Sequence, residues 1–355
     1  MSKLINVTDG STDIYNIRIS NGFQELDELL KPFLKLGKKA AIISDSNVEP
    51  LYGSEVRNII EKMGNPVFTY TFPAGEESKT LDTIQDIYEF LLSNNFERRD
   101  VLIALGGGVT GDLTGFAAAT YLRGISFIQL PTTLLSQTDS SIGGKTGVDF
   151  RGFKNMVGAF YQPKLVLIDP ELLYTLPPRF LHDGLAEVIK YGCIRDTGLF
   201  TRLEQLPGDA ALLAQAEEII AACCKIKARI VAQDEFDTGE RMLLNFGHTL
   251  GHAVEKAFHY DTYSHGEAVG LGMVLLTSQA EKLGLTDPGT AAKIAALLQK
   301  FSLPVEITLP REEFIKTIAL DKKKRGSQLT LVLIKDIGEG YLHTIENRDL
   351  PNYLP

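Results

Sequence analysis

Short apolar runs alternate with helix-like stretches along the first half of the chain. Five runs that end in polar or glycine turns predict buried strands: KKAAIISDSNV (38–48), PVFTYTFPAGEESK (66–79), DVLIALGGGVTGD (100–112), GISFIQLPTT (124–133) and KLVLIDP (164–170). Between them, apolar residues recur with helical spacing over residues 23–35, 51–62 and 81–92. Strands that alternate with helices predict a Rossmann-like, mainly parallel α/β domain.

The pattern changes after LYTLPPRF (173–180), where two prolines mark a boundary. Helical periodicity then dominates, and we expect helices over residues 184–194, 210–233, 241–259, 266–283 and 290–301. Near the end, SQLTLVLIKDIGEGYLHTI (327–345) predicts a β-hairpin around a glycine turn. The chain therefore predicts an α/β domain over residues 1–178 and a mainly α-helical domain over residues 179–355.

Composition and charge narrow the class of protein. Of the 355 residues, 44% are hydrophobic and 23% are charged, as in ordinary globular proteins. A net charge of −9 argues against a nucleic-acid partner but permits a local cationic pocket for an anionic small molecule. The sequence has no membrane-length apolar run, no secretory signal and, among three cysteines, no CxxC pair. We therefore expect a cytoplasmic protein without membrane contact.

A glycine turn lies in LGGGVTGD, where Gly106, Gly108 and Gly111 satisfy the spacing G-x-G-x-x-G. It follows a predicted strand and opens a predicted helix, the context in which backbone amides hold a pyrophosphate. Two features depart from the dinucleotide fingerprint: the turn follows a late strand, and no acidic residue ends the next one. Asp45, with Asn47 beside it, offers another carboxylate for a ribose, although SDSNV also fits an Asx turn.

Histidines are concentrated in one region of the second half. The four within residues 248–265 are His248, His252, His259 and His265. His248 and His252 stand four apart in NFGHTLGH and would share one face of a helix, but Thr249 replaces the glutamate of the HExxH zinc motif. Zinc binds imidazole nitrogen and carboxylate oxygen, and spacing leaves Glu187, Glu255 and Glu267 open as the carboxylate ligand.

Basic and amide residues cluster around the same motifs. They are Lys145, Lys154, Asn155, Lys190, Lys227, Arg241 and Asn245. Lys190 stands three residues after Glu187 and therefore on the same helix face. Taken singly, each lysine fits a solvated surface position, but several of these residues lie in glycine-rich or apolar surroundings, which is less typical of solubilising charge.

Six motifs, in order along the chain, carry a resemblance to a known family: LGGGVTGDLTGF, PTTLLSQTDSSIGGKTGVD, KNMVGAFYQP, DGLAEVIKYG, RMLLNFGHTLGHAVE and YSHGEAVGLGM. The chain resembles the 3-dehydroquinate synthases, sugar-phosphate cyclases that catalyse the second step of the shikimate pathway. The resemblance covers nearly the whole chain. It implies an N-terminal domain that binds NAD, a helical domain that binds metal, an active site in the cleft between them, and a homodimer.

The resemblance also implies roles for individual residues. Zinc or cobalt would be held by Glu187, His248 and His265. NAD would be contacted by Asp45, Asn47, Glu76, Lys79, Gly107, Gly108, Val109, Asp112, Thr132, Thr133, Asp139, Ser140 and Lys154. The small anionic sugar-phosphate substrate would be held by Lys145, Asn155, Lys190, Lys227, Arg241, Asn245 and His252.

Two further basic positions follow from the same resemblance. Arg123, in YLRGI, matches a family arginine that reaches into the phosphate pocket of the neighbouring subunit. A lysine near the C-terminus would come from DKKKRG (321–326), as either Lys322 or Lys323. If residues 241–259 form one helix, Asn245 lies one turn before His248 on the same side, and His252 faces the substrate phosphate.

The chemistry that the resemblance implies is redox-neutral. The C5 hydroxyl of 3-deoxy-D-arabino-heptulosonate 7-phosphate is oxidised with NAD, phosphate leaves by β-elimination, and the hydride returns to C5. Ring opening and an intramolecular aldol closure then give 3-dehydroquinate. A metal ion would polarise the C4 and C5 oxygens, and the departing phosphate takes the C6 proton, so we expect no conventional catalytic base.

Rival functions remain open at this point. Another sugar-phosphate cyclase, such as a 2-epi-5-epi-valiolone or 2-deoxy-scyllo-inosose synthase, would share the fold, NAD and metal. Asn155, Asn245 and His252 agree better with the dehydroquinate synthase pattern, although a synthase for an aminated substrate is not distinguished. A metal-dependent polyol dehydrogenase would share the architecture but would accumulate NADH. An inactivated relative is disfavoured because every matched ligand and cation is present.

Overall fold

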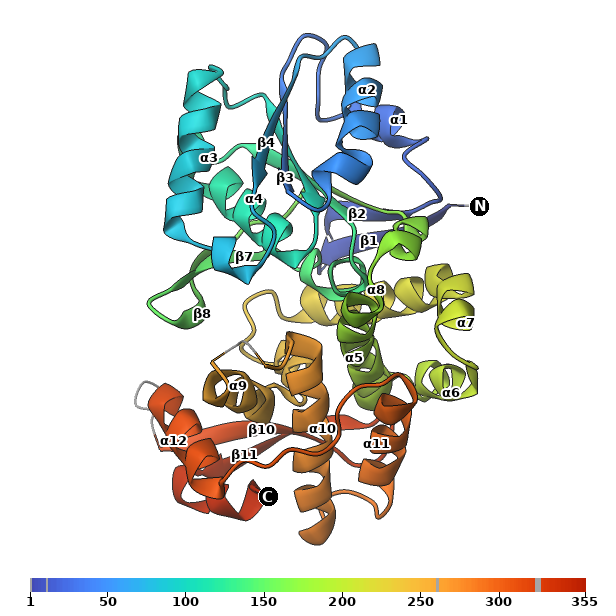
Figure 1. Ribbon diagram of the computed structural model, residues 1–355, viewed down its shortest axis with the longest axis vertical. Coiled ribbons are helices and arrows are strands. Elements are labelled where there is room, and N and C mark those ends of the chain that lie inside the picture. The colour runs from blue at the N-terminus through green and yellow to red at the C-terminus, as the bar shows by residue number, and fades with distance from the viewer. Residues whose placement is uncertain (1, 11, 260–261, 323–326) are drawn as a thin grey trace. The chain divides into compact units, whose positions relative to one another are not determined.

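The computed structural model describes residues 2–10, 12–259, 262–322 and 327–355, with backbone only for residues 319–322. The chain divides into two compact units (Figure 1): Met1–Leu176 with Lys227–Glu235, and Pro177–Ile226 with Phe236–Pro355. The division predicted from the sequence, after residue 178, placed residues 227–235 in the second domain, because the sequence shows no change of pattern around them.

A seven-stranded sheet forms the centre of the first unit, in the order β1-β2-β9-β6-β5-β3-β4. Its strands are β1 (Lys3–Asp9), β2 (Thr12–Ile19), β3 (Ala40–Asp45), β4 (Val67–Phe72), β5 (Val101–Gly106), β6 (Ser126–Pro131) and β9 (Leu165–Ile168). All neighbours pair in parallel except β1 and β2, which form an antiparallel ribbon. The five predicted strands and the mainly parallel α/β architecture are confirmed.

Helices cover both faces of this sheet (Figure 1). One face packs against α1 (Leu26–Leu30) and α2 (Ser54–Lys62), and the other against α3 (Leu81–Ser93) and α4 (Gly108–Thr120). Within β5, Ile103 faces the first pair of helices and Leu102 faces the second. Because both faces are buried, the central strands β3, β5 and β9 are nearly continuous apolar runs rather than alternating ones. Short helical turns complete the unit: η1 (Glu49–Gly53), η2 (Glu76–Ser78), η3 (Tyr121–Arg123), η4 (Ser136–Ser140) and η5 (Pro170–Thr175).

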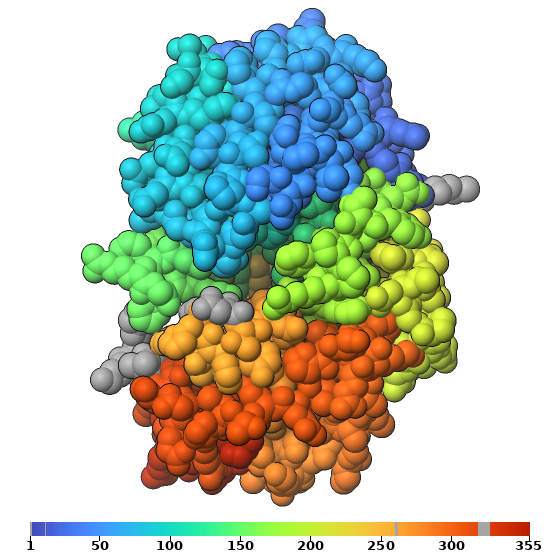
Figure 2. All heavy atoms as spheres, viewed as in Figure 1, coloured from blue at the N-terminus to red at the C-terminus, as the bar shows by residue number. Residues whose placement is uncertain are grey.

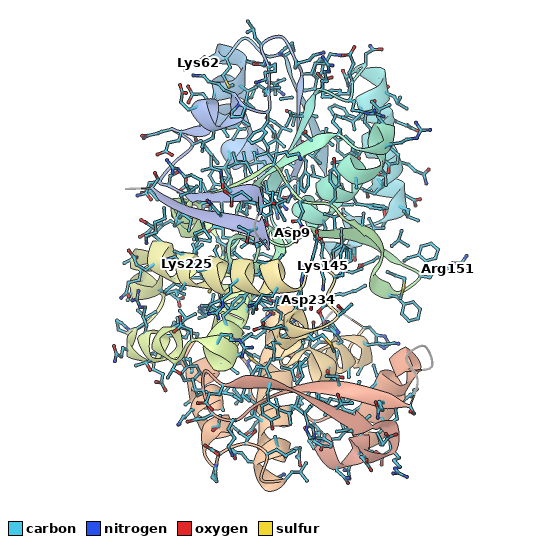
Figure 3. The ribbon with its side chains drawn as sticks, turned by 180° about the vertical axis from the view of Figure 1, so that it is seen from behind. Asp9, Lys62, Lys145, Arg151, Lys225 and Asp234 are labelled. Atoms are coloured by element: carbon cyan, nitrogen blue, oxygen red, sulfur yellow. The ribbon has the colours of Figure 1, made fainter. Side chains whose placement is uncertain are left out.

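A hairpin of β7 (Lys145–Phe150) and β8 (Phe153–Phe160) projects from the first unit beyond α4. Figure 3 shows Lys145 near its base and Arg151 at its tip, and in Figure 2 the same segment stands out from the surface of this unit. Sequence analysis predicted neither this hairpin nor the β1–β2 ribbon. Gly147 and Gly158 lie opposite each other in the hairpin, and a Cβ at Gly158 would lie 2.1 Å from the Thr146 carbonyl oxygen. These glycines interrupt the apolar face, on which Val148, Val157 and Ala159 pack against the core.

The second unit is mainly helical. Its elements are α5 (Pro178–Arg195), α6 (Thr197–Gln205), α7 (Asp209–Ala214), α8 (Ala216–Gln233, whose last turns group with the first unit), η6 (Glu240–Asn245), α9 (His248–Ala257), α10 (His265–Lys282), α11 (Thr290–Lys300), α12 (Arg311–Lys322), β10 (Gln328–Ile334), β11 (Gly340–Glu346) and η7 (Asn347–Tyr353). Its core joins apolar residues of α9, α10 and α12 with the hairpin β10–β11. The predicted helical domain and C-terminal hairpin are confirmed.

Two predicted helices were wrong in detail. The helix predicted over residues 210–233 is broken at Gln215 into α7 and α8, and α6 and α12 were not predicted. The helix predicted over residues 241–259 is the 3-10 turn η6 followed by α9. Gly247 adopts a left-handed φ of 81° and Phe246 is extended, so the helix cannot run through them. None of the helices in the described part of the chain has both the length and the apolar character needed to cross a bilayer.

Candidate functional site

The carboxyl ends of β3 and β5 lie side by side at the point where the order of the first unit's sheet reverses. From β3 the chain moves outward to β4 and then returns to β5 on the opposite side of β3. Open α/β sheets bind ligands in the crevice outside such a switch point. Asp45 ends β3, and the glycine turn follows β5. The acidic residue beside the glycine turn is therefore Asp45, because β3 neighbours β5 in the sheet. This arrangement explains why the turn follows a late strand and why the strand after the turn does not end in an acidic residue.

Side chains that follow β6 pack closely against the glycine turn. A Cβ at Gly107 would lie 3.2 Å from Thr133 Cγ2, and a Cβ at Gly108 would lie 3.1 Å from Ser140 Oγ. Gly107 is the N-cap of α4, whose first amides have no acceptor within the helix. Loop segments after β6 thus line the start of α4, and the turn offers backbone donors where an anionic group can approach closely.

Asp45 is shared between a turn and the glycine region. Its Oδ1 accepts hydrogen bonds from the amides of Asn47 (2.9 Å) and Val48 (3.1 Å), so SDSNV does form an Asx turn. Its Oδ2 accepts a hydrogen bond from Thr110 Oγ1 at 3.3 Å. The carboxylate is therefore fixed by the turn with its second oxygen directed toward α4.

Lys79 is the buried centre of a polar network in the first unit. Its Nζ lies 2.6 Å from Asp112 Oδ2 and 3.8 Å from Glu76 Oε1, and it donates to Asn155 Oδ1 at 2.5 Å. Burial alone would lower the pKa of Lys79, but the carboxylates of Asp112 and Glu76 outweigh burial and raise it. The structure therefore brings three predicted site residues around the ammonium group of a fourth.

Asp149 supports this network and was missed by sequence analysis. Its Oδ1 accepts the Asn155 amide at 2.8 Å, and its own amide donates to the Lys79 carbonyl at 2.9 Å. Asn155 has a left-handed φ of 52°, a conformation that needs such support in a non-glycine residue. Asp149 stands inside the motif GGKTGVD, but only the hairpin shows which residues it contacts.

Lys227 contacts Asp139, one of the residues predicted to bind NAD. Its Nζ donates to the Asp139 carbonyl oxygen at 2.6 Å and lies 2.8 Å from Asp139 Oδ1. Lys227 is only 5% exposed and lies in the last turns of α8, which group with the first unit. Other predicted residues of this unit occupy different places: Val109 follows Gly108 in α4, the Thr132 amide donates to the Gly106 carbonyl, Lys154 lies in β8, and Lys145 and Arg123 are exposed.

A separate group of potential metal ligands lies in the second unit, on α5, α9 and α10. Glu187 Oε1 lies 3.5 Å from His248 Nε2 and 3.6 Å from His265 Nε2. Tetrahedral coordination with bonds of about 2.1 Å places ligand atoms about 3.4 Å apart. The spacing and the mixture of one carboxylate with two imidazoles therefore fit zinc or cobalt. Glu267, another candidate from the sequence, instead accepts the Ser264 amide at 2.7 Å and caps α10.

Glycines explain why these helices approach so closely. A Cβ at Gly272 of α10 would lie 2.0 Å from the Gly247 carbonyl oxygen, and one at Gly251 of α9 would lie 2.9 Å from the Ala268 carbonyl oxygen. The glycine before each histidine in NFGHTLGH therefore packs against the backbone of α10. Gly266, after His265, packs in the same way against α5, since a Cβ there would lie 2.0 Å from the Asp183 carbonyl oxygen. Small residues at these positions determine the separation of the ligand-bearing helices.

Each ligand histidine presents Nε2 to Glu187 and Nδ1 to another acceptor. His248 Nδ1 lies 3.2 Å from the Phe246 carbonyl oxygen, and His265 Nδ1 lies 3.4 Å from Glu255 Oε1. Burial lowers the pKa of His248 to about 3. Burial also opposes protonation of His265, but Glu187 and Glu255 outweigh it and raise its pKa to about 10. A proton on His265 thus balances the carboxylates, and a metal cation would replace that charge.

The other predicted residues of this unit differ in how close they lie to the three metal ligands. Lys190 is 1% exposed and forms an ion pair with Glu187 Oε2. The ring of His252 lies 5.4 Å from that of His248, one turn along the same helix. Arg241, 2% exposed, and Asn245 lie in η6, so the expectation that Asn245 shares a helix with His248 was wrong. The side chain of Lys322 and all of Lys323 lie outside the described residues.

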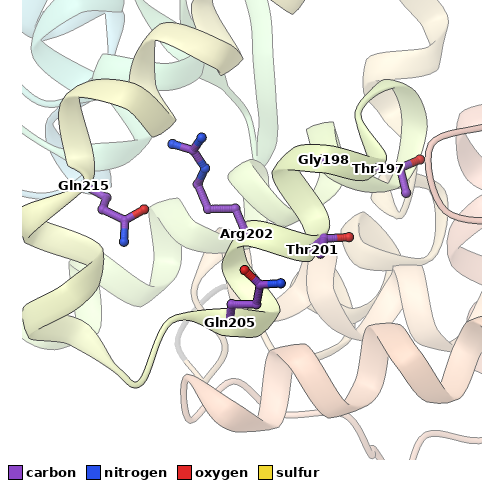
Figure 4. Close-up of a pocket in the computed structure, with 6 residues that line it drawn as sticks. All are labelled: Thr197, Gly198, Thr201, Arg202, Gln205 and Gln215. Carbon is purple, nitrogen blue, oxygen red and sulfur yellow. The ribbon is translucent and has the colours of Figure 1, made fainter.

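A polar pocket elsewhere in the second unit contains none of the predicted site residues. It has a volume of about 540 Å³ and opens between α6 and the start of α8 (Figure 4). Its lining is formed by Thr197, Gly198, Thr201, Arg202, Gln205 and Gln215. The candidate site is therefore defined by the converging metal ligands, and this pocket is not part of it.

Two family models match the chain consecutively. The model described as "3-dehydroquinate synthase N-terminal" matches residues 69–183, and "3-dehydroquinate synthase C-terminal" matches residues 184–324. The chain is 50% identical to the 3-dehydroquinate synthase of Clostridium acetobutylicum over 343 residues, which cover 96% of each protein.

Two solved structures with similar folds contain NAD+ and a divalent metal ion. A 2-deoxy-scyllo-inosose synthase, complexed with carbaglucose-6-phosphate, NAD+ and Co2+, matches with a TM-score of 0.86 and 26% identity, covering 99% of this chain and 98% of that one. A 2-epi-5-epi-valiolone synthase from Streptomyces hygroscopicus, with NAD+ and Zn2+ bound, matches with a TM-score of 0.85 and 27% identity, covering 95% and 94%.

Proposed function

The chain belongs to the 3-dehydroquinate synthase family, and we propose that it converts 3-deoxy-D-arabino-heptulosonate 7-phosphate into 3-dehydroquinate and phosphate, using NAD and a divalent metal ion. The observation that carries this proposal is the convergence of Glu187, His248 and His265 with Lys190 beside them. These residues combine a metal site with a fixed cation, as an anionic, hydroxyl-bearing substrate requires. Identity to the dehydroquinate synthases is about twice that to the two other cyclases, which favours this substrate.

Glu187, His248 and His265 would hold zinc or cobalt. When bound, such an ion polarises hydroxyl oxygens and lowers the pKa of the one that is oxidised. Lys190 is fixed by its ion pair with Glu187 in a buried environment. There it supplies a positive charge that orients an anionic group without a reorganisation cost.

NAD would be held at the carboxyl ends of β3, β5 and β6. The start of α4, at Gly107 and Gly108, suits the pyrophosphate because the helix amides point outward there. Asp45, fixed by its Asx turn, suits a ribose hydroxyl. The remaining contacts proposed from the family pattern are Asn47, Glu76, Lys79, Val109, Asp112, Thr132, Thr133, Asp139, Ser140 and Lys154. When bound, NAD accepts and returns the hydride.

The substrate carries a phosphate and a carboxylate, and the cations proposed to bind them are Lys145, Lys190, Lys227 and Arg241, with Asn155, Asn245 and His252 as neutral or titratable partners. Arg241 and Lys227 are almost fully buried. A buried cation is costly unless it is paired with a carboxylate, as Lys227 is with Asp139, or serves a ligand. Their proposed task is orientation and charge stabilisation, with the departing phosphate as the base.

We also propose that the protein acts in the cytoplasm as a homodimer that exchanges Arg123 between subunits. Leu122 and Arg123 both adopt left-handed φ angles, 50° and 64°, and Arg98 donates two hydrogen bonds to the Leu122 carbonyl. This strained turn presents Arg123 at the surface. The nearby β7–β8 hairpin exposes Phe150, Phe153, Met156 and Phe160 at 38–46%, an apolar surface that a second subunit would cover. The three cysteines are buried thiols, as a reducing compartment permits.

The deciding assay incubates the purified protein with the heptulosonate phosphate, Zn2+ and catalytic NAD. We expect one phosphate and one 3-dehydroquinate per substrate consumed, with no lasting absorbance from NADH. Glucose 6-phosphate serves as the control substrate and should release no phosphate. Steady NADH accumulation would indicate a polyol dehydrogenase, and phosphate release from glucose 6-phosphate alone would indicate another cyclase. Either result would refute the proposed function.

A further inference from the structure

We infer that Glu255 is a positioning residue for the metal site: its carboxylate holds the His265 imidazole in the tautomer that leaves Nε2 for the metal ion. The inference rests on the proposed function, because it concerns the same metal. It adds a residue to which neither the sequence motifs nor the family pattern assigns a role. From the sequence spacing, Glu255 was only one of three candidates for the carboxylate ligand.

The geometry places Glu255 and Glu187 on opposite sides of one imidazole ring. Glu255 lies on α9, one turn after His252, and is 1% exposed. Its Oε1 is 3.4 Å from His265 Nδ1, whereas Glu187 Oε1 is 3.6 Å from His265 Nε2. A carboxylate can only accept a hydrogen bond, so Glu255 favours the proton on Nδ1. The lone pair on Nε2 then points toward Glu187, where the metal would lie.

The second ligand histidine provides an internal comparison. His248 directs Nδ1 to the backbone carbonyl of Phe246 at 3.2 Å, which is a neutral acceptor. Both imidazoles are therefore oriented with Nε2 toward Glu187, one by the backbone and one by a charged side chain. A carboxylate acceptor makes the imidazole a stronger electron donor to the metal than a neutral carbonyl does. Of the two orienting contacts, only that of Glu255 can be changed by substitution.

Glu255 could alternatively be a metal ligand itself. His252, Glu255 and His265 also place ligand atoms within 4.8 Å of one another, so this group could itself hold a metal. The two nitrogens of His265 point in opposite directions, and a single ion cannot use both. In that arrangement Glu255 would be a ligand and Glu187 would not. The burial of Glu187, at 0% exposure, and its contacts with both imidazole Nε2 atoms favour the first group.

The test measures zinc binding directly on metal-free protein, by competition with a chromogenic chelator and without substrate. We expect Glu255→Gln to weaken zinc binding about 10-fold, because the amide oxygen still accepts from Nδ1 but carries no charge, and Glu255→Leu to weaken it about 100-fold. Glu187→Gln should bind far more weakly than either. The matched control is Glu267→Gln, which removes a carboxylate two residues from His265 and keeps the capping box, since glutamine also serves at that position. Its affinity should stay within about 2-fold of the original protein.

A spectroscopic measurement separates positioning from general destabilisation. The visible absorption of the Co2+ form should shift in Glu255→Gln and remain unchanged in Glu267→Gln, while thermal unfolding shows whether each metal-free variant is folded. Unchanged zinc affinity and an unchanged cobalt spectrum in folded Glu255→Gln would overturn the inference and leave the metal site intact. Loss of binding in Glu255→Gln with retention in Glu187→Gln would overturn it in favour of the other ligand group. If the original protein bound no zinc, the proposed metal site would fail, and the inference with it.

Discussion

Replacement of Gly272 by alanine should disrupt the metal site from a distance. The new Cβ would lie 2.0 Å from the Gly247 carbonyl oxygen and 2.8 Å from the Gly251 amide nitrogen, whereas ordinary contact begins at 3.4 Å. Rotation of a side chain cannot relieve this clash, because both atoms belong to the backbone of the segment that carries His248. The helices α9 and α10 must therefore separate by roughly 1 Å at this point.

The size of the effect follows from two opposing contributions. Alanine in place of glycine stabilises a helix interior by about 1 kcal/mol, while overpacking costs about 1–3 kcal/mol and tends to the upper end against backbone atoms. We expect a net loss of about 1–2 kcal/mol and, for a chain of 355 residues, a fall in Tm of about 1–3 °C. The metal site is more sensitive, because ligand distances tolerate only about 0.2 Å. Separation of His248 from His265 should weaken zinc binding by about tenfold or more.

The assay compares zinc affinity and thermal unfolding of Gly272→Ala with those of Gly270→Ala. Both substitutions lie in α10 and gain the same helix propensity. A Cβ at Gly270 would meet Leu298 Cδ2 at 3.2 Å, the end of a side chain that can move. Gly270→Ala should therefore retain full zinc affinity and stability. Equal zinc affinities for the two variants would refute the idea that backbone contact between α9 and α10 positions the ligands.

Three further predictions concern other parts of the proposed site. His248→Ala should lose bound zinc, whereas His252→Ala should retain zinc and raise the KM for the phosphorylated substrate; equal zinc loss in metal analysis would contradict this division of roles. Lys79→Met should leave the half-buried Asp112 carboxylate without its ammonium partner, lowering stability by about 2 kcal/mol in denaturant titrations and weakening NAD binding; an unchanged midpoint would show that the pair is not needed. Arg123→Ala should be inactive alone but regain activity when mixed with His248→Ala subunits, since hybrid dimers contain one intact site; failure of mixed, dimeric samples to recover activity would exclude the exchange of Arg123.

Local patterns along the chain were sufficient for most of the architecture. Apolar runs predicted β3, β5, β6 and β9, because strands buried on both faces need few polar positions. The edge strand β4 was predicted from its valine, phenylalanine and tyrosine residues, which alternate with threonines. The β1–β2 ribbon carries alternating burial and could have been found from that periodicity. The glycine-rich β7–β8 hairpin could not, since the paired Gly147 and Gly158 interrupt its short apolar face of Val148, Val157 and Ala159.

The sequence by itself determined the chemical inventory of this protein: a glycine turn after a buried strand, a histidine-rich segment, and cations within glycine-rich motifs. Only the tertiary structure decided how that inventory is assigned. It separated Glu187, beside both imidazole Nε2 atoms, from Glu255, which faces His265 Nδ1, and from Glu267, which caps a helix. Periodicity along a chain reports which face of a helix a residue occupies. The partner it meets depends on another helix distant in sequence, and here on the glycines that let the two backbones touch.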